Sequence, residues 1–404
     1  MFISSGSTTK LQYLIVSLIV VFSGSLIPFI FSENYSTFLV VFLLFLLGLS
    51  PFFKHLKTNS YSYFYLLLII LFLLVLMLFR GEFDNSKEYV GVIGRLLIAY
   101  LATILISKKK FIAAYTDLFV FYSAFSLIMY LIGFVSLDFI RSLPISFNDA
   151  GTGYRHLYFY FYQGIDTWNF RNSGLFWEAG AYQVFLSLAL LFEIYFIKKS
   201  IARKVILIAA VASTVSTIGI LVLAILSFAR LFSRRSLYNV FLPSILILTL
   251  FIFQIFDELL WGKFDGENIS GVDRIVGQLA DLQLFTGSPV FGVGYAAYPD
   301  SFRAAAYALG AVAPTSTNSF TGLLALNGIF YSLLLFLPMF NFFIKNDLKI
   351  GNRILILVIF IILLSSQGLF NQLLFLVLLF YGLQNGPDLQ TGSARQRSPS
   401  NLAS

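Results

Sequence analysis

Long apolar runs that follow one another along the chain constrain its fold more than any other feature. Most are close to the about 20 residues that an α-helix needs to cross the hydrocarbon core of a bilayer. Of all residues, 58% are hydrophobic and 11% are charged, a balance that no soluble domain of this size has. We therefore expect an all-α, polytopic integral membrane protein. The clear spans are 11–31, 35–53, 61–79, 89–106, 115–137, 174–197, 238–257 and 316–344.

The composition also excludes several kinds of site. The sequence has no cysteine, so it has no disulfide, no thiolate metal site and no cysteine nucleophile. Its two histidines, His55 and His156, are too few for a histidine metal cluster. Its basic residues are spread over many short loops, as topology signals are, and do not indicate nucleic-acid binding. We expect no metal, no cofactor and no nucleic-acid partner.

The stretch 205–232 is too long for one untilted span and short for two. Charge decides between them, because basic clusters favour the cytoplasmic side of a membrane. A single helix would place the cluster around Arg230 outside, whereas two short helices that turn within 213–217 return it to the inside. We therefore predict a hairpin, in which Ser and Thr hydroxyls satisfy the backbone groups freed by the turn.

The stretch 354–383 presents the same choice. Ser365-Ser366-Gln367-Gly368 favours a second short hairpin, although a stretch of this length can also cross as one tilted helix. The first run, 11–31, is too long for the core of a signal peptide and is predicted to remain as the first membrane helix. These assignments predict about 11–12 transmembrane helices in one domain, residues 1–385, with a cytoplasmic C-terminus. The polar tail, 386–404, is predicted to be disordered.

Two long loops, 138–173 and 258–315, fall on the opposite, periplasmic face in this topology. In the second loop, the spacing of apolar residues predicts a short helix at 272–285, and the alanine-rich stretch 301–312 is a second candidate. The polar segment 314–319 is expected to cap the next helix. Both loops carry arginines that the positive-inside rule would not place there, which favours binding of something anionic. They are Arg141, Arg155, Arg171, Arg274 and Arg303.

Two further positions combine charge with an apolar setting. Arg171 and Glu178 stand where the first loop runs into a long apolar helix. One interpretation is that Arg171 meets lipid head groups while Glu178 complements the helix dipole, and the other is a site at the water–lipid boundary. Arg95 lies inside the span 89–106, where an arginine is costly and indicates function. Snorkelling of its side chain to the head groups is an equal alternative.

The segment Arg171-x-x-Gly174-x-Phe176-x-Glu178, which opens a helix, resembles the signature of bacterial O-antigen and related polysaccharide polymerases. Three further pieces of that family's pattern follow in order, and the resemblance covers roughly 170–385. The N-terminal third is similar only in hydropathy. The three pieces are Ser213–Thr217, then Asp273-Arg274 with 288–295, then Thr317-Asn318-Ser319-Phe320 with Asn327-Gly328.

The resemblance implies a fold similar to O-antigen ligases and to lipid-linked-sugar glycosyltransferases of the all-helical membrane class. It implies a multi-pass protein of the bacterial inner membrane that transfers a growing glycan from undecaprenyl diphosphate onto a new lipid-linked repeat unit at the periplasmic face. The expected partners are undecaprenyl-diphosphate-linked oligosaccharide, the lipid bilayer, a chain-length regulator and a flippase. Ligases usually carry a histidine at the place of Thr317, so this departure favours a polymerase over an O-antigen ligase.

In such a polymerase a diphosphate leaves, and arginine forks stabilise its growing charge without a metal. A carboxylate takes the proton of the acceptor hydroxyl or orients it. The alternative from another class is a transporter or flippase of an anionic or lipid-linked substrate, which is the lesser interpretation because the polar residues concentrate on one face. The resemblance implies Glu178, Arg171 and Asp273 as catalytic residues, and Arg274, Arg303, Arg95, Tyr295 and Asn318 as substrate-binding residues.

Overall fold

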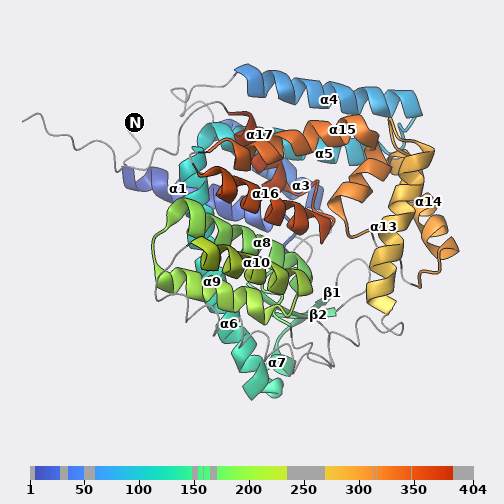
Figure 1. Cartoon of the computed structure of the whole chain (residues 1–404). Coiled ribbons are helices and arrows are strands. Elements are labelled where there is room, and N and C mark those ends of the chain that lie inside the picture. Colours follow the sequence, from blue (N-terminus) through green and yellow to red (C-terminus); the bar gives the residue numbers. More distant parts are fainter. Residues whose placement is uncertain are drawn as a thin grey trace, which may run out of the picture.

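The structure, a computed structural model, describes residues 5–27, 35–49, 60–147, 153–157, 159–163, 171–233, 269–312, 314, 316–346 and 348–384. The predicted span 238–257, the tail 386–404 and parts of both long loops lie outside these ranges. Within them the chain is mostly helical, as predicted (Figure 1). In order, the helices are α1 (Ser5–Val21), α3 (Tyr35–Leu49), α4 (Ser60–Arg80), α5 (Ser86–Leu105), α6 (Lys108–Val135), α7 (Leu137–Ser142), α8 (Ala179–Phe192), α9 (Ile201–Ser213), α10 (Thr217–Ser233), α13 (Ile269–Gly287), α14 (Gly294–Ala308), α15 (Ser319–Ile344), α16 (Ile350–Ser365) and α17 (Leu373–Leu383).

Five helices within the described residues are long and apolar enough to cross a membrane. They are α4, α5, α6, α15, and α8 together with the π-helical turn Glu193–Ile197 that continues it. Large apolar side chains point outward from α4, where Leu71 is 59% exposed and Phe79 is 72% exposed. Such outward apolar surface is stable only against lipid or another apolar partner. The described part of the chain therefore has the character of an all-α membrane protein.

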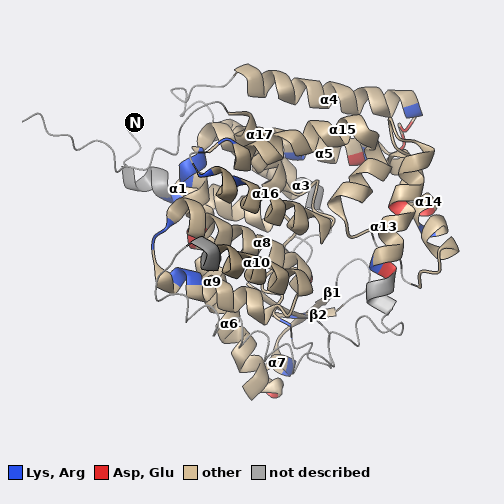
Figure 2. Ribbon diagram, viewed as in Figure 1, with Lys and Arg blue, Asp and Glu red and all other residues tan. Residues whose placement is uncertain are grey.

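The core is built on α17, in which every residue is buried. It lies against α5 and α15, and α16 packs on α15 as well (Figure 1). Figure 2 shows that the helices are uncharged over most of their length and that charge gathers near helix ends and connecting segments. At one such end Arg203 contacts Asp117 at 2.6 Å and Glu193 at 2.8 Å. These contacts tie the start of α9 to α6 and to the π-helical turn after α8.

Both predicted hairpins are present. α9 ends at Ser213 and α10 begins at Thr217, and Val215 between them adopts φ 48°. The Thr214 hydroxyl donates to the Val211 carbonyl at 2.7 Å, so a side chain satisfies a backbone group freed by the turn, as predicted. α16 and α17 form the second hairpin, joined by a turn over residues 366–372.

A small antiparallel sheet in the first long loop is not expected from the sequence. β1 (Ile145–Phe147), β2 (Gly153–Leu157) and β3 (Tyr160–Gln163) pair in the order β1-β2-β3, with Tyr154 opposite Gln163. Strands of this length show too little alternation to be recognised. Arg155, one of the loop arginines that the sequence assigned to anions, is 8% exposed and donates to the carbonyls of Arg141 and Leu143. Its guanidinium therefore holds the loop together.

The second long loop contains α13, which confirms the predicted helix at 272–285. The prediction of a helix at 301–312 is wrong in its bounds, because α14 runs over Gly294–Ala308. Its N-terminus is set by Glu82, in the connection from α4 to α5, whose carboxylate accepts from the N–H groups of Tyr295 (3.3 Å) and Ala296 (3.1 Å). A helix start fixed by a residue so distant in the chain is invisible to local sequence patterns.

α15 is broken near its start. Gly328 has φ 77° and ψ −178°, which is not helical, so a short piece precedes the break and a long piece follows it. The turn before α14 docks on the break, since Val293 N–H donates to the Ala325 carbonyl (2.8 Å) and Ile329 N–H donates to the Pro289 carbonyl (2.9 Å). A Cβ at Gly328 would collide with the Val290 carbonyl, so glycine is required here by both conformation and space.

Candidate functional site

The candidate site is built around residues 171–178, which lead into α8. Asn172 fixes this segment. Its backbone N–H donates to the Ser213 carbonyl at 2.9 Å, and its Nδ2 donates to the hydroxyls of Ser126 (3.2 Å) and Ser213 (2.9 Å). Its Oδ1 accepts from the Gly174 N–H at 3.0 Å. One buried side chain thus ties the segment to α6 and to the α9–α10 turn.

Gly174 and Phe176 anchor the same segment in the core. Gly174 has φ 54°, and a Cβ there would lie 2.5 Å from the Tyr182 ring, so only glycine fits. Phe176 is buried and stacks on Phe185 with ring centroids 4.3 Å apart. Packing contacts account for the presence of glycine and phenylalanine at these two positions. They do not account for the two charged residues of the segment, Arg171 and Glu178.

Arg171, Glu178 and Arg274 come together at the N-terminus of α8. Glu178 directly precedes that helix, and Arg274, near the start of α13, places Nη2 3.9 Å from Oε2 of Glu178. This ion pair joins the second long loop to the segment that connects the first long loop with α8. The side chains of Arg274 and Glu178 are 40% and 28% exposed, so a ligand can reach both.

Electrostatics at Arg171 favour an anion beside it. Burial lowers the pKa of its guanidinium, Glu178 raises it, and Arg274 lowers it, so both charged neighbours act on the group. Its Nε donates to the Thr214 carbonyl at 3.1 Å, which orients the planar fork. Two arginines share one carboxylate here, so the group carries an excess positive charge that an incoming anion would offset.

The surroundings of Glu178 supply further donors. The first N–H groups of α8 have no partner within the helix and make its N-terminus electropositive. A Cβ at Gly180 would lie 2.6 Å from Nε2 of Gln367 and 3.3 Å from Oε1 of Glu178, which places the Gln367 amide beside the carboxylate. The site therefore gathers groups from both long loops and from the α16–α17 turn.

Three of the predicted site residues do not belong to the group formed by Arg171, Glu178 and Arg274. Asp273 is buried, and its Oδ1 accepts from the Val312 N–H at 2.8 Å, which holds α13 to the segment after α14. Asn318 caps α15 by accepting from the Phe320 N–H at 2.8 Å, as expected of that polar segment. Arg303 is exposed on α14.

Arg95 and Tyr295, the remaining two, belong to a second polar group. The hydroxyl of Tyr295 accepts from Nδ2 of Asn327 at 3.4 Å, with Asn371 also in hydrogen-bonding reach. Burial raises the pKa of Tyr295, and both Asn327 and Arg95 oppose that rise. Asn371 and Gln367 lie four residues apart in the α16–α17 turn, so their Cα atoms are at most about 14 Å apart.

The sequence did not identify several polar residues of the structure as candidate site residues. Gln367 and Asn371 are isolated amides in an apolar stretch, and Glu82 lies in a short connection. Asp281 is completely buried and accepts from the hydroxyls of Tyr298 (2.7 Å) and Ser316 (2.8 Å). A polar residue inside an apolar run is the one sequence signal that points to the two amides.

Among the described residues no group of three or more His, Asp or Glu side chains is arranged to hold a metal ion. No protein-family model matches the chain, and no curated protein matches it either.

Proposed function

We propose that the chain is a polysaccharide polymerase of the O-antigen type, a membrane glycosyltransferase. In this proposal the anomeric carbon–oxygen bond to undecaprenyl diphosphate breaks, and a glycosidic bond forms to a hydroxyl of a new lipid-linked repeat unit. The diphosphate leaves with the electron pair of the broken bond. The proton of the acceptor hydroxyl passes to a carboxylate. The active site faces the periplasm of a bacterial inner membrane.

The observation that carries the proposal is the convergence of Arg171, Glu178 and Arg274 at one helix N-terminus. Glu178 accepts the hydroxyl proton, because a contact of 3.9 Å to Arg274 is longer than a hydrogen bond and leaves its lone pairs available. The arginines and the α8 N-terminus stabilise the diphosphate as its charge grows. The Gln367 amide holds the acceptor against Glu178.

The surface polysaccharide of a strain that lacks this gene tests the proposal. A polymerase predicts that the core carries one repeat unit and no longer chain. A core without any repeat unit would instead indicate a ligase or an earlier export step, and normal long-chain polysaccharide would refute all three. Labelling of a cysteine placed at Ser233 tests the orientation, because the proposal puts this position in the cytoplasm, out of reach of a membrane-impermeant reagent added from the periplasm.

One observation favours the alternative of a transporter. Broken helices that carry polar groups are typical of transporter binding sites, and α15 is broken at Gly328 beside Asn327. The two functions differ in what they do to the substrate. Purified protein in vesicles with lipid-linked repeat units elongates the glycan if it is a polymerase, and moves the unit across the membrane unchanged if it is a transporter.

A further inference from the structure

A cluster of buried polar atoms beside α5 lacks partners among the described residues. Its members come from α5, α15 and the α16–α17 turn, and they lie around the side chain of Tyr295. Asn327 and Tyr331 are completely buried. Buried polar groups in folded proteins nearly always have a hydrogen-bond partner, so several orphans in one place indicate that a partner from outside the described residues belongs there. The orphan atoms are Arg95 Nε, Asn327 Oδ1, Tyr331 Oη and Asn371 Oδ1.

Arg95 adds an uncompensated charge to this cluster. It lies near the middle of α5, nine residues after Ser86, and forms no ion pair with any residue that the structure describes. The carboxylate of Glu82 is occupied by Arg80 and by the N-terminus of α14. A guanidinium inside a membrane-spanning bundle is costly unless it is paired. An anion bound beside Arg95 would compensate this charge.

The side chain of Arg95 reaches toward the polar end of the bundle. A Cβ on Gly91, one turn earlier in α5, would lie 3.9 Å from Nη2 of Arg95, so the guanidinium extends back toward the start of α5. A Cβ on Gly94 would meet nothing within 4 Å. The surface of α5 beside Gly94, the neighbour of Arg95 in the chain, is therefore open.

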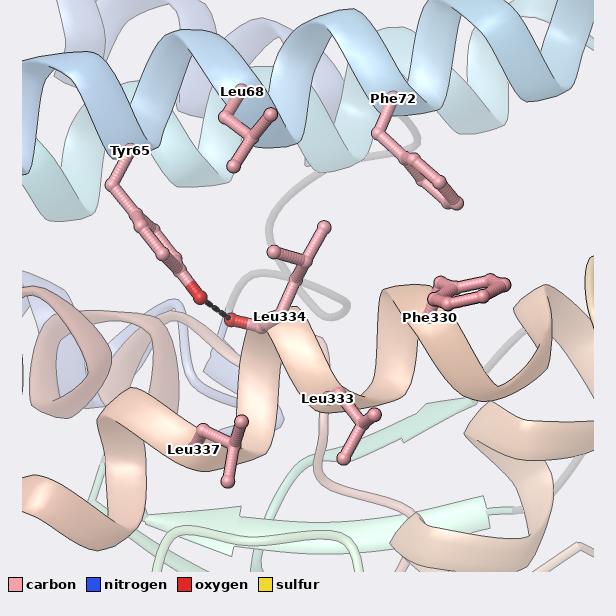
Figure 3. A pocket seen from close by; sticks show the side chains of 7 residues that line it. All are labelled: Tyr65, Leu68, Phe72, Phe330, Leu333, Leu334 and Leu337. Carbon is pink, nitrogen blue, oxygen red and sulfur yellow. Dashed lines mark hydrogen bonds between the residues drawn. The ribbon is translucent and has the colours of Figure 1, made fainter.

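An apolar groove lies between α4 and α15. Its volume is about 260 Å³, and Tyr65 crosses it to donate to the Leu334 carbonyl at 2.9 Å (Figure 3). Its walls are apolar, and several wall residues are exposed on the outer surface, among them Phe330 at 53% and Leu337 at 54%. The lining residues are Tyr65, Leu68, Phe72, Phe330, Leu333, Leu334 and Leu337.

Tyr331 connects the groove to the polar cluster. Its ring stacks on Phe72, a groove residue, with centroids 6.2 Å apart, while its hydroxyl is one of the orphan atoms. Phe72 lies eight residues before Arg80, about 12 Å along α4 from the polar end, and Tyr65 lies deeper still. The polar cluster is therefore nearer the polar end and the apolar groove is farther from it, which is how a lipid is oriented in a bilayer.

We propose that an anionic phospholipid of the bilayer is bound here, with its phosphate at Arg95 and one hydrocarbon chain in the α4–α15 groove. Arg95 donates to the phosphate oxygens, and Tyr331 adds a hydroxyl. The amides of Asn327 and Asn371 contact the glycerol and ester groups. A zwitterionic lipid fits less well, because its head brings a cation that competes with Arg95 for the same phosphate.

The bilayer itself is the source of the occupant that we propose. A lipid of the bilayer can stay beside Arg95 throughout, whereas a substrate comes and goes. The bilayer supplies phospholipid at all times. The proposal does not depend on glycosyl transfer, so the polymerase assignment and this site can fail separately.

Lipid that remains bound through purification tests the proposal. The full-length chain is purified in detergent from membranes that contain phosphatidylglycerol, its lipids are extracted, and phospholipid per chain is measured by phosphorus assay and mass spectrometry. Wild-type protein should retain a stoichiometric amount of anionic phospholipid, and Arg95→Gln should lose it. Arg141→Gln is the matched control, because Arg141 is 58% exposed and pairs with Asp138. It should retain the lipid.

A second variant tests the same site in case Arg95→Gln does not fold. Leu68→Trp fills the groove without touching Arg95 and should also lose the lipid. In parallel, phosphatidylglycerol added to delipidated wild-type protein should raise its unfolding temperature, with a shift that grows with lipid concentration. Phosphatidylcholine should produce little shift, and Leu68→Trp should respond to neither lipid.

Three results would overturn the proposal. One is equal phospholipid in wild type, Arg95→Gln and Leu68→Trp. Another is an equal thermal shift with phosphatidylcholine, which would show that the charge at Arg95 plays no part. The third is a polyprenyl phosphate in place of a glycerophospholipid among the extracted lipids, which would make the site a substrate site.

Discussion

The hydrogen bond from Tyr65 to Leu334 offers a test of how α4 is attached to the bundle. Pro338 lies four residues after Leu334 in α15 and has no N–H, so it cannot donate to the Leu334 carbonyl. Tyr65, on α4, donates to that carbonyl instead, at 2.9 Å. Tyr65→Phe removes the donor and leaves the carbonyl without a partner. We expect a loss of about 1 kcal/mol in the free energy of unfolding, between the values typical of interhelical hydrogen bonds in membranes and of buried unpaired groups.

A double-mutant cycle isolates this effect. Pro338→Ala restores an N–H that can donate to Leu334 within the helix, so Tyr65→Phe should cost less in that background than in the wild type, by more than the about 0.3–0.5 kcal/mol within which independent sites add. Reversible unfolding of the purified chain in mixed micelles measures all four variants. Tyr63→Phe is the control, since Tyr63 is 52% exposed on the same helix. An equal loss from Tyr65→Phe with and without Pro338 would refute the argument.

Three further predictions concern the loops and the chemistry. Gly294→Ala should lower folded protein far more than Gly81→Ala, because both glycines have positive φ but only at Gly294 does a Cβ collide with Glu82; thermal unfolding of both compares them, and equal losses would exclude the collision as the cause. Burial raises the pKa of Asp281 above its ordinary 3.8, so the folded state binds the proton more tightly than the unfolded state does. The free energy of unfolding should therefore fall as pH rises from 3.8 through the raised pKa. Asp281→Asn should flatten this pH dependence and the control Asp138→Asn should not; an unchanged slope in Asp281→Asn would refute the assignment. Polymer formation should survive EDTA, because arginines compensate the diphosphate; a loss that magnesium or manganese restores would contradict this.

The features that the sequence predicted correctly depend on long-range regularities. Apolar run length and the basic cluster around Arg230 predicted the hairpin at 213–217, and the polar residues at 365–368 favoured the break between α16 and α17. Helical spacing predicted α13 in the same way. The capping role of the segment before Phe320 follows from the local chemistry of Asn318, whose side chain needs no tertiary partner to act.

Other features depend on contacts that no local pattern contains. The start of α14 is set by Glu82, more than two hundred residues earlier in the chain, and the sheet of the first loop consists of strands too short to show alternation. Arg171 and Glu178 were predicted from charge in an apolar setting, but their meeting with Arg274 needs the two loops to fold together. Arg95 was identified by its cost within a span, whereas the orphan atoms around it appear only when α5, α15 and the α16–α17 turn are assembled.

The length of polymer made by Arg171→Lys and Glu178→Gln tests the central claim most directly. Lysine keeps the charge at 171 but loses the planar fork, and glutamine keeps the size at 178 but loses the proton acceptor. Membrane abundance is quantified for each, because Nε of Arg171 also holds the Thr214 carbonyl. Arg141→Lys and Asp138→Asn are the matched controls in the same loop.

Each variant is expressed in the deletion strain, and chain length is read on a gel. At normal abundance we expect Glu178→Gln to lower polymer formation by about 100-fold or more, the usual scale for a lost acid–base group. We expect Arg171→Lys to lower it strongly, and the controls to make long chains. Normal long-chain polymer from both Arg171→Lys and Glu178→Gln, at normal abundance, would contradict the account and show that the segment 171–178 serves only the fold.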